Sequence, residues 1–151
     1  MTTLTKEAFS LVGISTTTSN ENGKAAQDIP ALWQRFMSEN IGHKVPNKIN
    51  ETVYALYSDY EGDHTRPYQI TIGYKVASLD NIPEDLTVKL VAKSKFVKFM
   101  AEGDLTKDAV INTWMEIWNM DLPRTYTADL EIYDDRAADL TNGVAEILIG
   151  V

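Results

Sequence analysis

The residues best suited to chemistry lie in a strand-like segment, ADLEIY, near the carboxyl end of the chain. Side chains alternate along a strand, so Asp129, Glu131 and Tyr133 share one face. Leu130 and Ile132 share the other face, which we expect to pack on helices. A carboxylate in mid-strand, such as that of Glu131, is solvated, paired with a Lys or Arg, or kept for a ligand. The residues alone leave these alternatives open.

Aromatic side chains are the second group that could serve a binding site. The chain has three Trp, seven Tyr and four Phe, and Trp33, Trp114 and Trp118 all fall on predicted helices. Packing in the core is the simplest interpretation for Trp118. For Trp114, which lies centrally on its helix, we favour the lining of a pocket, and for Trp33 the two roles are evenly balanced. Aromatic faces attract cations, so a carboxylate among them predicts a site selective for positive charge.

Several kinds of chemistry lack residues to support them. The chain has no Cys, which excludes disulfides and thiolate chemistry. It has no Gly-rich phosphate loop and no Gly-x-Ser-x-Gly motif. The two histidines, His43 and His64, fall in predicted loops, where surface roles are the ordinary interpretation. We therefore expect no metal site and no cofactor.

The overall composition narrows the class of protein. The chain has 151 residues, 44% of them hydrophobic, and a formal net charge of −8. That charge disfavours general nucleic-acid binding, which needs a basic surface, and it raises the local concentration of cations. The amino-terminal residues do not form a signal peptide, and no apolar run approaches the ~18 residues of a membrane span. We expect a cytoplasmic protein without membrane contact.

The first half of the chain predicts one helix among three strands. An apolar run precedes a Ser/Thr stretch and a loop with an Asn-Gly pair. Asp28 and Pro30 are typical of a helix start, with Leu32, Trp33 and Phe36 on its apolar side. The expected elements are a strand at 9–14, loops at 15–19 and 20–24, a helix at 28–39, a loop at 40–50, a strand at 52–60, a turn at 61–67 and a strand at 68–76.

The second half predicts the same order. Thr106 is the expected cap of a helix whose apolar side carries Val110, Trp114, Ile117 and Trp118. The expected elements are a linker at 77–85, one or two strands at 86–102, a helix from 106 to about 120, a strand at 128–133, a loop at 134–143 and a strand at 144–151.

The two halves therefore predict a single α+β domain, residues 1–151, built from a duplicated β-α-β-β unit with half-repeats at about 1–77 and 86–151. Two short sequence similarities between the halves agree with duplication. Residues 33–36 (WQRF) match 114–117 (WMEI), and residues 70–73 (ITIG) match 147–150 (ILIG). Two such halves side by side predict an antiparallel sheet with a ligand groove at their junction.

An ordered set of residues also resembles a known family. The segments 54–63 (YALYSDYEGD) and 68–73 with Val76 resemble the first-half hairpin of the GyrI-like, AraC-type effector-binding domains. Residues 96–99 (FVKF), Gly103, Trp114, Pro123 and 130–133 (LEIY) resemble the second half. The match extends from Phe9 to Val151. One departure is the end of the chain, IGV, where the family often has Ile-Pro-Ile or Pro-Val.

The resemblance implies an SHS2-like duplicated fold with a central channel that binds cationic, amphipathic, drug-like molecules, as in multidrug-sensing regulators. It implies that Glu131 contacts the positive charge of the ligand. Such domains usually follow a DNA-binding segment, but this one begins at Phe9, so we expect no such segment and no direct nucleic-acid contact. Stand-alone members occur on mobile gene cassettes such as those of integrons. The expected ligand-binding residues are Glu131, Trp114, Trp33, Tyr57, Tyr68, Tyr133 and Phe99.

Two other functions stay open. Some relatives in the superfamily are similar to hydrolases of reactive electrophiles, and Glu131 could then act as a general acid or base, with Glu102 or Glu116 as a weak second acid. The resemblance also allows a gyrase-directed inhibitor or another interaction protein. We expect no enzymatic activity. A separate transcription regulator is a candidate partner, and the sequence allows a monomer or a dimer.

Overall fold

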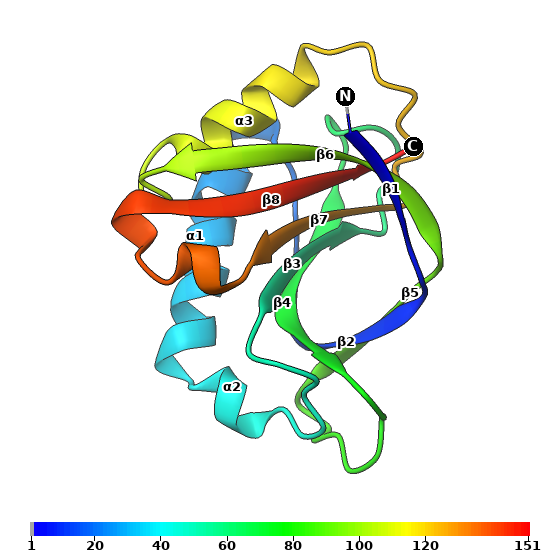
Figure 1. Cartoon of the computed structure of the whole chain (residues 1–151), viewed down its shortest axis with the longest axis vertical. Helices are drawn as coiled ribbons and strands as arrows, with labels where there is room; N and C mark the ends of the chain where they lie inside the picture. The colour runs from blue at the N-terminus through cyan, green and yellow to red at the C-terminus, as the bar shows by residue number, and fades with distance from the viewer. Residues whose placement is uncertain (1) are drawn as a thin grey trace.

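The computed structural model describes residues 2–151 and contains one antiparallel sheet of eight strands, in the order β1-β6-β8-β7-β3-β4-β2-β5. Figure 1 shows β6, β8, β7 and β3 following one another across the molecule, with α3 along the top and α1 passing behind the strands. The elements are β1 (Thr2–Lys6), β2 (Phe9–Thr18), α1 (Lys24–Ser38), α2 (Ile41–Lys44), β3 (Val53–Ser58), β4 (Tyr68–Val76), β5 (Thr87–Val91), β6 (Ser94–Gly103), α3 (Ala109–Trp118), β7 (Ala128–Tyr133) and β8 (Gly143–Gly150).

The sheet confirms the duplicated architecture. Strands β6-β8-β7 of the second half meet strands β3-β4-β2 of the first half at the β7–β3 pair, where Leu130 lies opposite Leu56. Ile72 lies opposite the residue before Leu56, and Ile149 lies opposite the residue before Leu130. The register thus superimposes the ITIG segment on the ILIG segment. The exact limits of the half-repeats stay a prediction.

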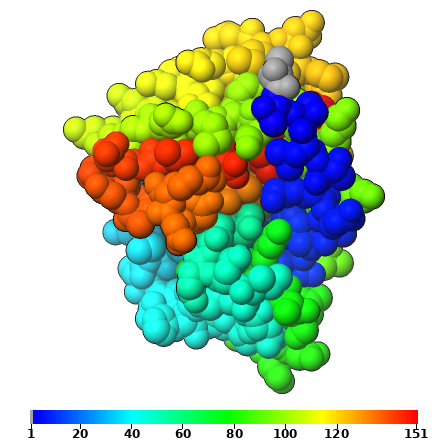
Figure 2. All heavy atoms as spheres, viewed as in Figure 1, coloured from blue at the N-terminus to red at the C-terminus, as the bar shows by residue number. Residues whose placement is uncertain are grey.

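The repeat is longer than the predicted β-α-β-β unit. Each half begins with an additional five-residue strand, β1 or β5, which ends two residues before the next strand. These strands pair across the halves: β1 pairs with β6, and β5 pairs with β2. In the space-filling view, β1 and β2 run down one side of the molecule beside the strands of the second half (Figure 2). Each half thus supplies an edge strand to the other.

Two buried cores lie on opposite faces of the sheet. The larger core takes Leu32 and Phe36 from α1, Trp114 and Ile117 from α3, and the inward side chains of the central strands. The smaller core contains no helix residue and lies under the exchanged edge strands. Its buried members are Leu11, Tyr54, Leu56, Val91, Phe96, Leu130, Ile132 and Leu148.

The expectation that Leu130 and Ile132 pack on helices is therefore wrong. Both side chains belong to the strand-only core, while α1 and α3 cover the opposite face of β7. The reason is that both faces of this sheet are buried, so an apolar pair on one face does not identify the face that the helices cover. The predicted alternation itself is confirmed on β3, where Ala55 and Tyr57 face the helices and Leu56 faces the smaller core.

Several element boundaries also differ from the predictions. Helix α1 begins at Lys24, after Gly23 in the left-handed conformation, so Pro30 lies inside the helix instead of in its first turn. Asp28 pairs with Lys24 at 2.7 Å and does not cap the helix. Strand β2 continues through the predicted loop 15–19 to Thr18. Helix α3 begins at Ala109, and Thr106 instead bonds to Asp104.

Glycines allow two strands to approach unusually closely near one end of the sheet. Gly13 of β2 lies opposite Gly73 of β4, and a Cβ atom on Gly13 would lie 1.9 Å from the carbonyl oxygen of Ile72. Only glycine fits such an approach. Within residues 2–151, no helix is long and apolar enough to cross a membrane.

Candidate ligand-binding site

Glu131 lies on β7 with its side chain on the helix-covered face of the sheet, and only 2% of the residue is exposed. Its strand position brings two tyrosines to it. Tyr133 follows two residues later on the same face, and Tyr57 of β3 is the diagonal neighbour, because Ala55 is the residue directly opposite Glu131. Diagonal neighbours across an antiparallel pair are within reach of aromatic side chains. Helix α3 supplies the third neighbour, Trp114.

All three neighbours donate hydrogen bonds to the carboxylate. The Tyr57 hydroxyl and the Trp114 indole Nε1 each donate to Oε2 of Glu131 at 2.7 Å. The Tyr133 hydroxyl donates to Oε1, also at 2.7 Å. These donors come from three separate elements, so the fold holds the carboxylate in one orientation. Hydrogen bonds of this kind favour the charged form of a carboxylate.

The negative charge of Glu131 has no cation beside it. Among residues 2–151, no Lys, Arg or His forms an ion pair with Glu131. Burial raises the pKa of Glu131, and the hydrogen bonds from Tyr133, Tyr57 and Trp114 offset part of that rise. Burial and the nearby carboxylate raise the pKa of Tyr57 and of Tyr133 well above the usual value, so both hydroxyls remain donors. The site therefore contains a buried carboxylate that only neutral groups stabilise.

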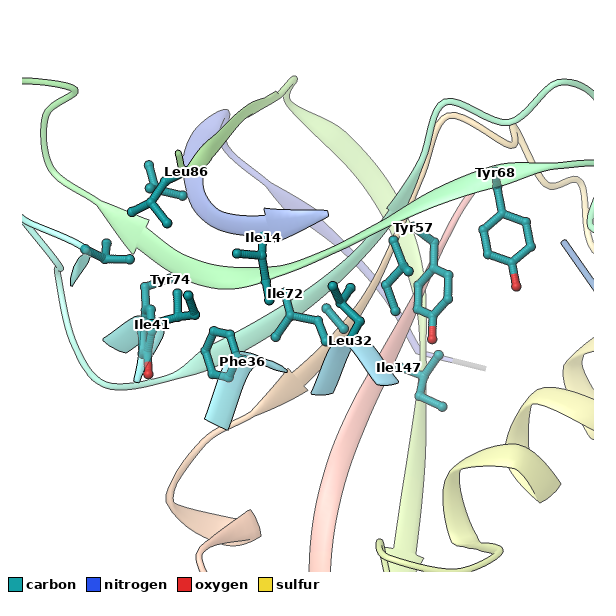
Figure 3. Close-up of a cluster of buried hydrophobic side chains, with 14 of the residues drawn as sticks. Ile14, Leu32, Phe36, Ile41, Tyr57, Tyr68, Ile72, Tyr74, Leu86 and Ile147 are labelled. Atoms are coloured by element: carbon teal, nitrogen blue, oxygen red, sulfur yellow. The ribbon is translucent and has the colours of Figure 1, made fainter. Parts of the chain in front are cut away.

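A cavity of 720 Å³ opens beside this carboxylate, which is a volume suited to a drug-sized molecule. One wall comes from α1 and another from α3. In Figure 3, Tyr57 and Tyr68 lie toward α3, whereas Phe36, Ile41 and Tyr74 lie at the other end of the cluster. The aromatic residues that line the cavity are Trp33, Tyr57, Tyr60, Tyr68, Trp114, Trp118 and Tyr133.

The aromatic side chains support one another. Trp33 meets Tyr133 edge-on, with ring centres 5.0 Å apart. Tyr57 packs against Trp114 at 5.1 Å and against Tyr68 at 5.8 Å. Rings that already contact one another are held in place before a ligand arrives, which lowers the entropy cost of binding. The arrangement can hold a flat or bulky apolar body that carries a positive charge, with aromatic faces around it and Glu131 as the counter-ion.

The structure brings together six of the seven residues expected from the sequence: Glu131, Trp114, Trp33, Tyr57, Tyr68 and Tyr133 all line this cavity. Phe99 does not line it. Its side chain packs at the margin of the main core, on β6 opposite Ile147. The predicted core residue Trp118 packs against that core and also lines the cavity, where its ring is stacked on His64 at 5.7 Å.

A second carboxylate, Asp129, lies two residues before Glu131 on the same strand face and is completely buried. Its surroundings differ. Nη2 of Arg124 lies 2.7 Å from Oδ2 of Asp129, and the Tyr60 hydroxyl donates to the same oxygen. The backbone N–H of Gly150 donates to Oδ1 at 2.9 Å. A proline at this position, as in the family's Ile-Pro pattern, has no N–H for that bond.

Arg124, Tyr60 and His64 line the cavity without having been identified from the sequence. His64 and Arg124 belong to loops, where alternation and helical spacing give no information about side-chain direction. Tyr60 was expected at the end of the strand 52–60, but β3 ends at Ser58 and Asp59 has a φ of 53°, so the alternation does not extend to Tyr60. The charge of Asp129 was the available signal, because a buried carboxylate on the predicted inner face requires a partner.

Glu102 and Glu116, the acids considered as partners for Glu131 in hydrolysis, are both exposed and neither lines the cavity. Within residues 2–151, no group of three or more His, Asp or Glu side chains is arranged to hold a metal ion.

Comparisons with known proteins identify relatives by sequence and by fold. Putative transcriptional regulator protein YobU of Bacillus subtilis is 29% identical over 130 residues, which cover 83% of this chain and 81% of YobU. An integron cassette protein of Vibrio cholerae has a similar crystal structure, with a TM-score of 0.77 and 28% identity over 99% of this chain and 94% of that one. The structure of SAV2435 bound to tetraphenylphosphonium matches with a TM-score of 0.82 and 24% identity, covering 99% of this chain and 92% of that one, which shows the shared fold.

The family assignment rests on a match along almost the whole chain. The model of the family described as integron-associated effector binding protein, Cass2, matches residues 3–151. The predicted resemblance to effector-binding domains is thereby confirmed, and this chain belongs to the Cass2 family of integron-associated effector-binding proteins.

Proposed function

We propose that this protein is a cytoplasmic binding protein for cationic, amphipathic small molecules, which it holds in the aromatic cavity with Glu131 as their counter-ion. The observation that carries the proposal is the buried carboxylate without a cation of its own, at the wall of a cavity lined by seven aromatic side chains. A ligand cation supplies the missing charge. SAV2435, which shares the fold, is bound to tetraphenylphosphonium, and that molecule is a cation of this class.

The shape of the cavity supports a role in multidrug sensing. Most of its wall is made of aromatic rings and aliphatic side chains, which make little directional demand, so ligands of different shape gain similar contact areas. The main polar requirement is positive charge near Glu131. Each cation–aromatic contact contributes roughly 0.5–2 kcal/mol. We propose that the protein reports or sequesters such molecules, with a separate transcription regulator as a candidate partner, and that it does not chemically change them.

The test compares two ions of the same shape and opposite charge, tetraphenylphosphonium and tetraphenylborate. Three Trp residues near the cavity allow intrinsic fluorescence to follow both titrations. We expect the wild-type protein to bind the phosphonium and not the borate. In Glu131→Gln the phosphonium affinity should fall by about 30-fold, because truncation of a buried charged partner costs about 2 kcal/mol or more.

A matched control is Glu116→Gln, which removes an exposed carboxylate of α3 outside the cavity. It should leave both titrations as in the wild type, because a solvated charge contributes little to a screened interaction. Equal binding of the phosphonium and the borate by the wild-type protein would contradict the proposal, and so would equal loss in the two variants.

A further inference from the structure

Arg124 is a buried cation in the wall of a cavity that we propose binds cations. Only 5% of its side chain is exposed, and it lies in the loop between α3 and β7. The guanidinium lies over the ring of Tyr126 at 4.3 Å, which holds its plane in position. A positive group at this place needs an explanation, because a lone cation in the wall would repel the proposed ligands.

The charge of Arg124 is cancelled locally. Its Nη2 lies 2.7 Å from Oδ2 of Asp129, which is itself fully buried. The pair adds no net charge to the cavity wall, so Glu131 remains the buried group that attracts a cation. Lys107, at the rim, is exposed, and water screens its charge.

The hydrogen-bonding capacity of Arg124 is not used up by this pair. A guanidinium carries five N–H donors in a fixed plane. Nε of Arg124 is buried and has no hydrogen-bond partner among residues 2–151. Buried donors are almost always bonded, and one without a partner costs free energy. In the structure neither oxygen of Asp129 accepts from Nε: Oδ2 accepts from Nη2 of Arg124 and from Tyr60, and Oδ1 accepts from the Gly150 N–H.

Arg124 and Glu131 line the same cavity, and strand β7 relates their positions. Asp129, which holds Arg124, and Glu131 are two residues apart on one face of β7. Residues at that spacing on a strand are separated by about 7 Å. A single drug-sized molecule can therefore reach both positions.

We propose that Arg124 is a second recognition residue of this cavity, and that the preferred ligand is a cation that also carries a hydrogen-bond acceptor, such as a carbonyl oxygen, at a distance from its positive centre comparable with the ~7 Å between Asp129 and Glu131 along β7. The acceptor takes an N–H of the Arg124 guanidinium that Asp129 does not occupy, while the cation lies near Glu131. This inference rests on the proposed function, because it names the class of cation that the same site selects.

The first test compares two phosphonium cations of matched shape. In (para-acetylphenyl)triphenylphosphonium a ketone oxygen lies at about the required distance from phosphorus, and (para-isopropenylphenyl)triphenylphosphonium replaces that oxygen by a CH₂ group. We expect wild-type protein to bind the ketone about tenfold more tightly, as is typical of a hydrogen bond to a charged donor. Equal affinities for the two cations would overturn the inference and leave the proposed function intact. Failure to bind either of them or tetraphenylphosphonium would overturn both.

The second test changes the protein. In the double variant Arg124→Met, Asp129→Asn both charges of the pair are removed together, and the preference for the ketone should disappear. Arg35→Met, which removes an exposed arginine of α1 outside the cavity, should keep the tenfold preference. A preference that survives in the double variant would overturn the role of Arg124.

A spectroscopic measurement on the wild-type protein does not depend on the folding of any variant. The Nε–H resonance of Arg124 in a nitrogen–proton NMR spectrum should shift with the ketone and stay in place with the isopropenyl compound. A merely structural Arg124 would respond equally to both cations, which would contradict the inference.

Discussion

Asp129 and Glu131 are two buried carboxylates on the same face of the same strand, but the fold treats them differently. Asp129 has an arginine at 2.7 Å, a tyrosine hydroxyl and a backbone N–H, and it does not line the cavity. Glu131 has three neutral donors and, among residues 2–151, no paired cation, and it does line the cavity. The protein thus pairs the Asp129 carboxylate with an internal cation and leaves the Glu131 carboxylate without one among residues 2–151.

We propose that this difference separates a structural role for Asp129 from a binding role for Glu131. Asp129 is a buried carboxylate that is paired with a cation and accepts further hydrogen bonds, and this pairing fixes the loop that carries Arg124. Removal of either partner would leave an uncompensated buried charge. A carboxylate stabilised by neutral donors keeps its charge in place without neutralising it. Only a carboxylate of the second kind gains a strong electrostatic interaction when a ligand cation enters the cavity. The predictions that follow test whether the two carboxylates differ in this way.

The largest expected effect is on the ion pair between Arg124 and Asp129. Arg124→Met leaves Asp129 buried without its cation, and we expect the free energy of unfolding to fall by about 3–5 kcal/mol. Unfolding in urea measures the change. Addition of Asp129→Asn in the same chain should restore most of the loss. A decrease below about 1 kcal/mol in the single variant would show that the pair acts as an exposed ion pair.

For Glu131 we expect the opposite effect on stability: removal of its charge should stabilise the folded protein at neutral pH. Because burial raises the pKa of Glu131 above 4.5 in the folded protein, the folded state holds the proton to higher pH than the unfolded state. The wild-type protein then loses stability as pH rises from about 4.5 through this raised pKa. Glu131→Gln does not carry this penalty. Its Tm should approach that of the wild type at low pH and rise relative to it as pH increases. A Tm difference that stays constant with pH would contradict this account.

The smallest effect concerns the donors to Glu131. Trp114→Phe keeps an aromatic ring and removes one hydrogen bond to the carboxylate, which favours the protonated form. The pH below which phosphonium binding fades should therefore move upward. Trp33→Phe is the matched control. Trp33 contacts Tyr133 edge-on, and within residues 2–151 it makes no hydrogen bond to Tyr57 or Glu131. Fluorescence titrations across a pH series measure both shifts. Equal shifts would show that ring packing, and not the indole donor, sets the pH dependence.

Much of the site could be predicted because its residues lie on regular elements. Alternation on β7 identified the shared face of Glu131 and Tyr133, and helical spacing identified Trp114 and Trp33. One of the two short sequence similarities also matched, because the strand pairings align residues 70–73 with residues 147–150. The assignment of Glu131 to a ligand came from the family resemblance and stays a proposal.

What could not be predicted depends on contacts between distant segments. Strand β1 is short and mostly polar, and it forms through its pairing with β6. The Arg124–Asp129 pair depends on a loop in which Tyr126 has a φ of 54°, a conformation that its sequence does not indicate. The start of α1 at Lys24 was missed because Asp and Pro at positions 28 and 30 are residue types typical of a helix start. The turn before the helix instead lies at Asn22 and Gly23, which both have positive φ angles.

The most direct test of the central claim is to count protons during binding. Calorimetric titration with tetraphenylphosphonium, in buffers of different ionisation enthalpy, measures the protons exchanged. At a pH just above 4.5, the ordinary pKa of a glutamate, part of the free protein holds Glu131 protonated, and an arriving cation should expel that proton. We predict net proton release in the wild type that vanishes in Glu131→Gln. Binding without proton release at any pH, or equal release by the variant, would contradict the claim that the ligand supplies the missing charge.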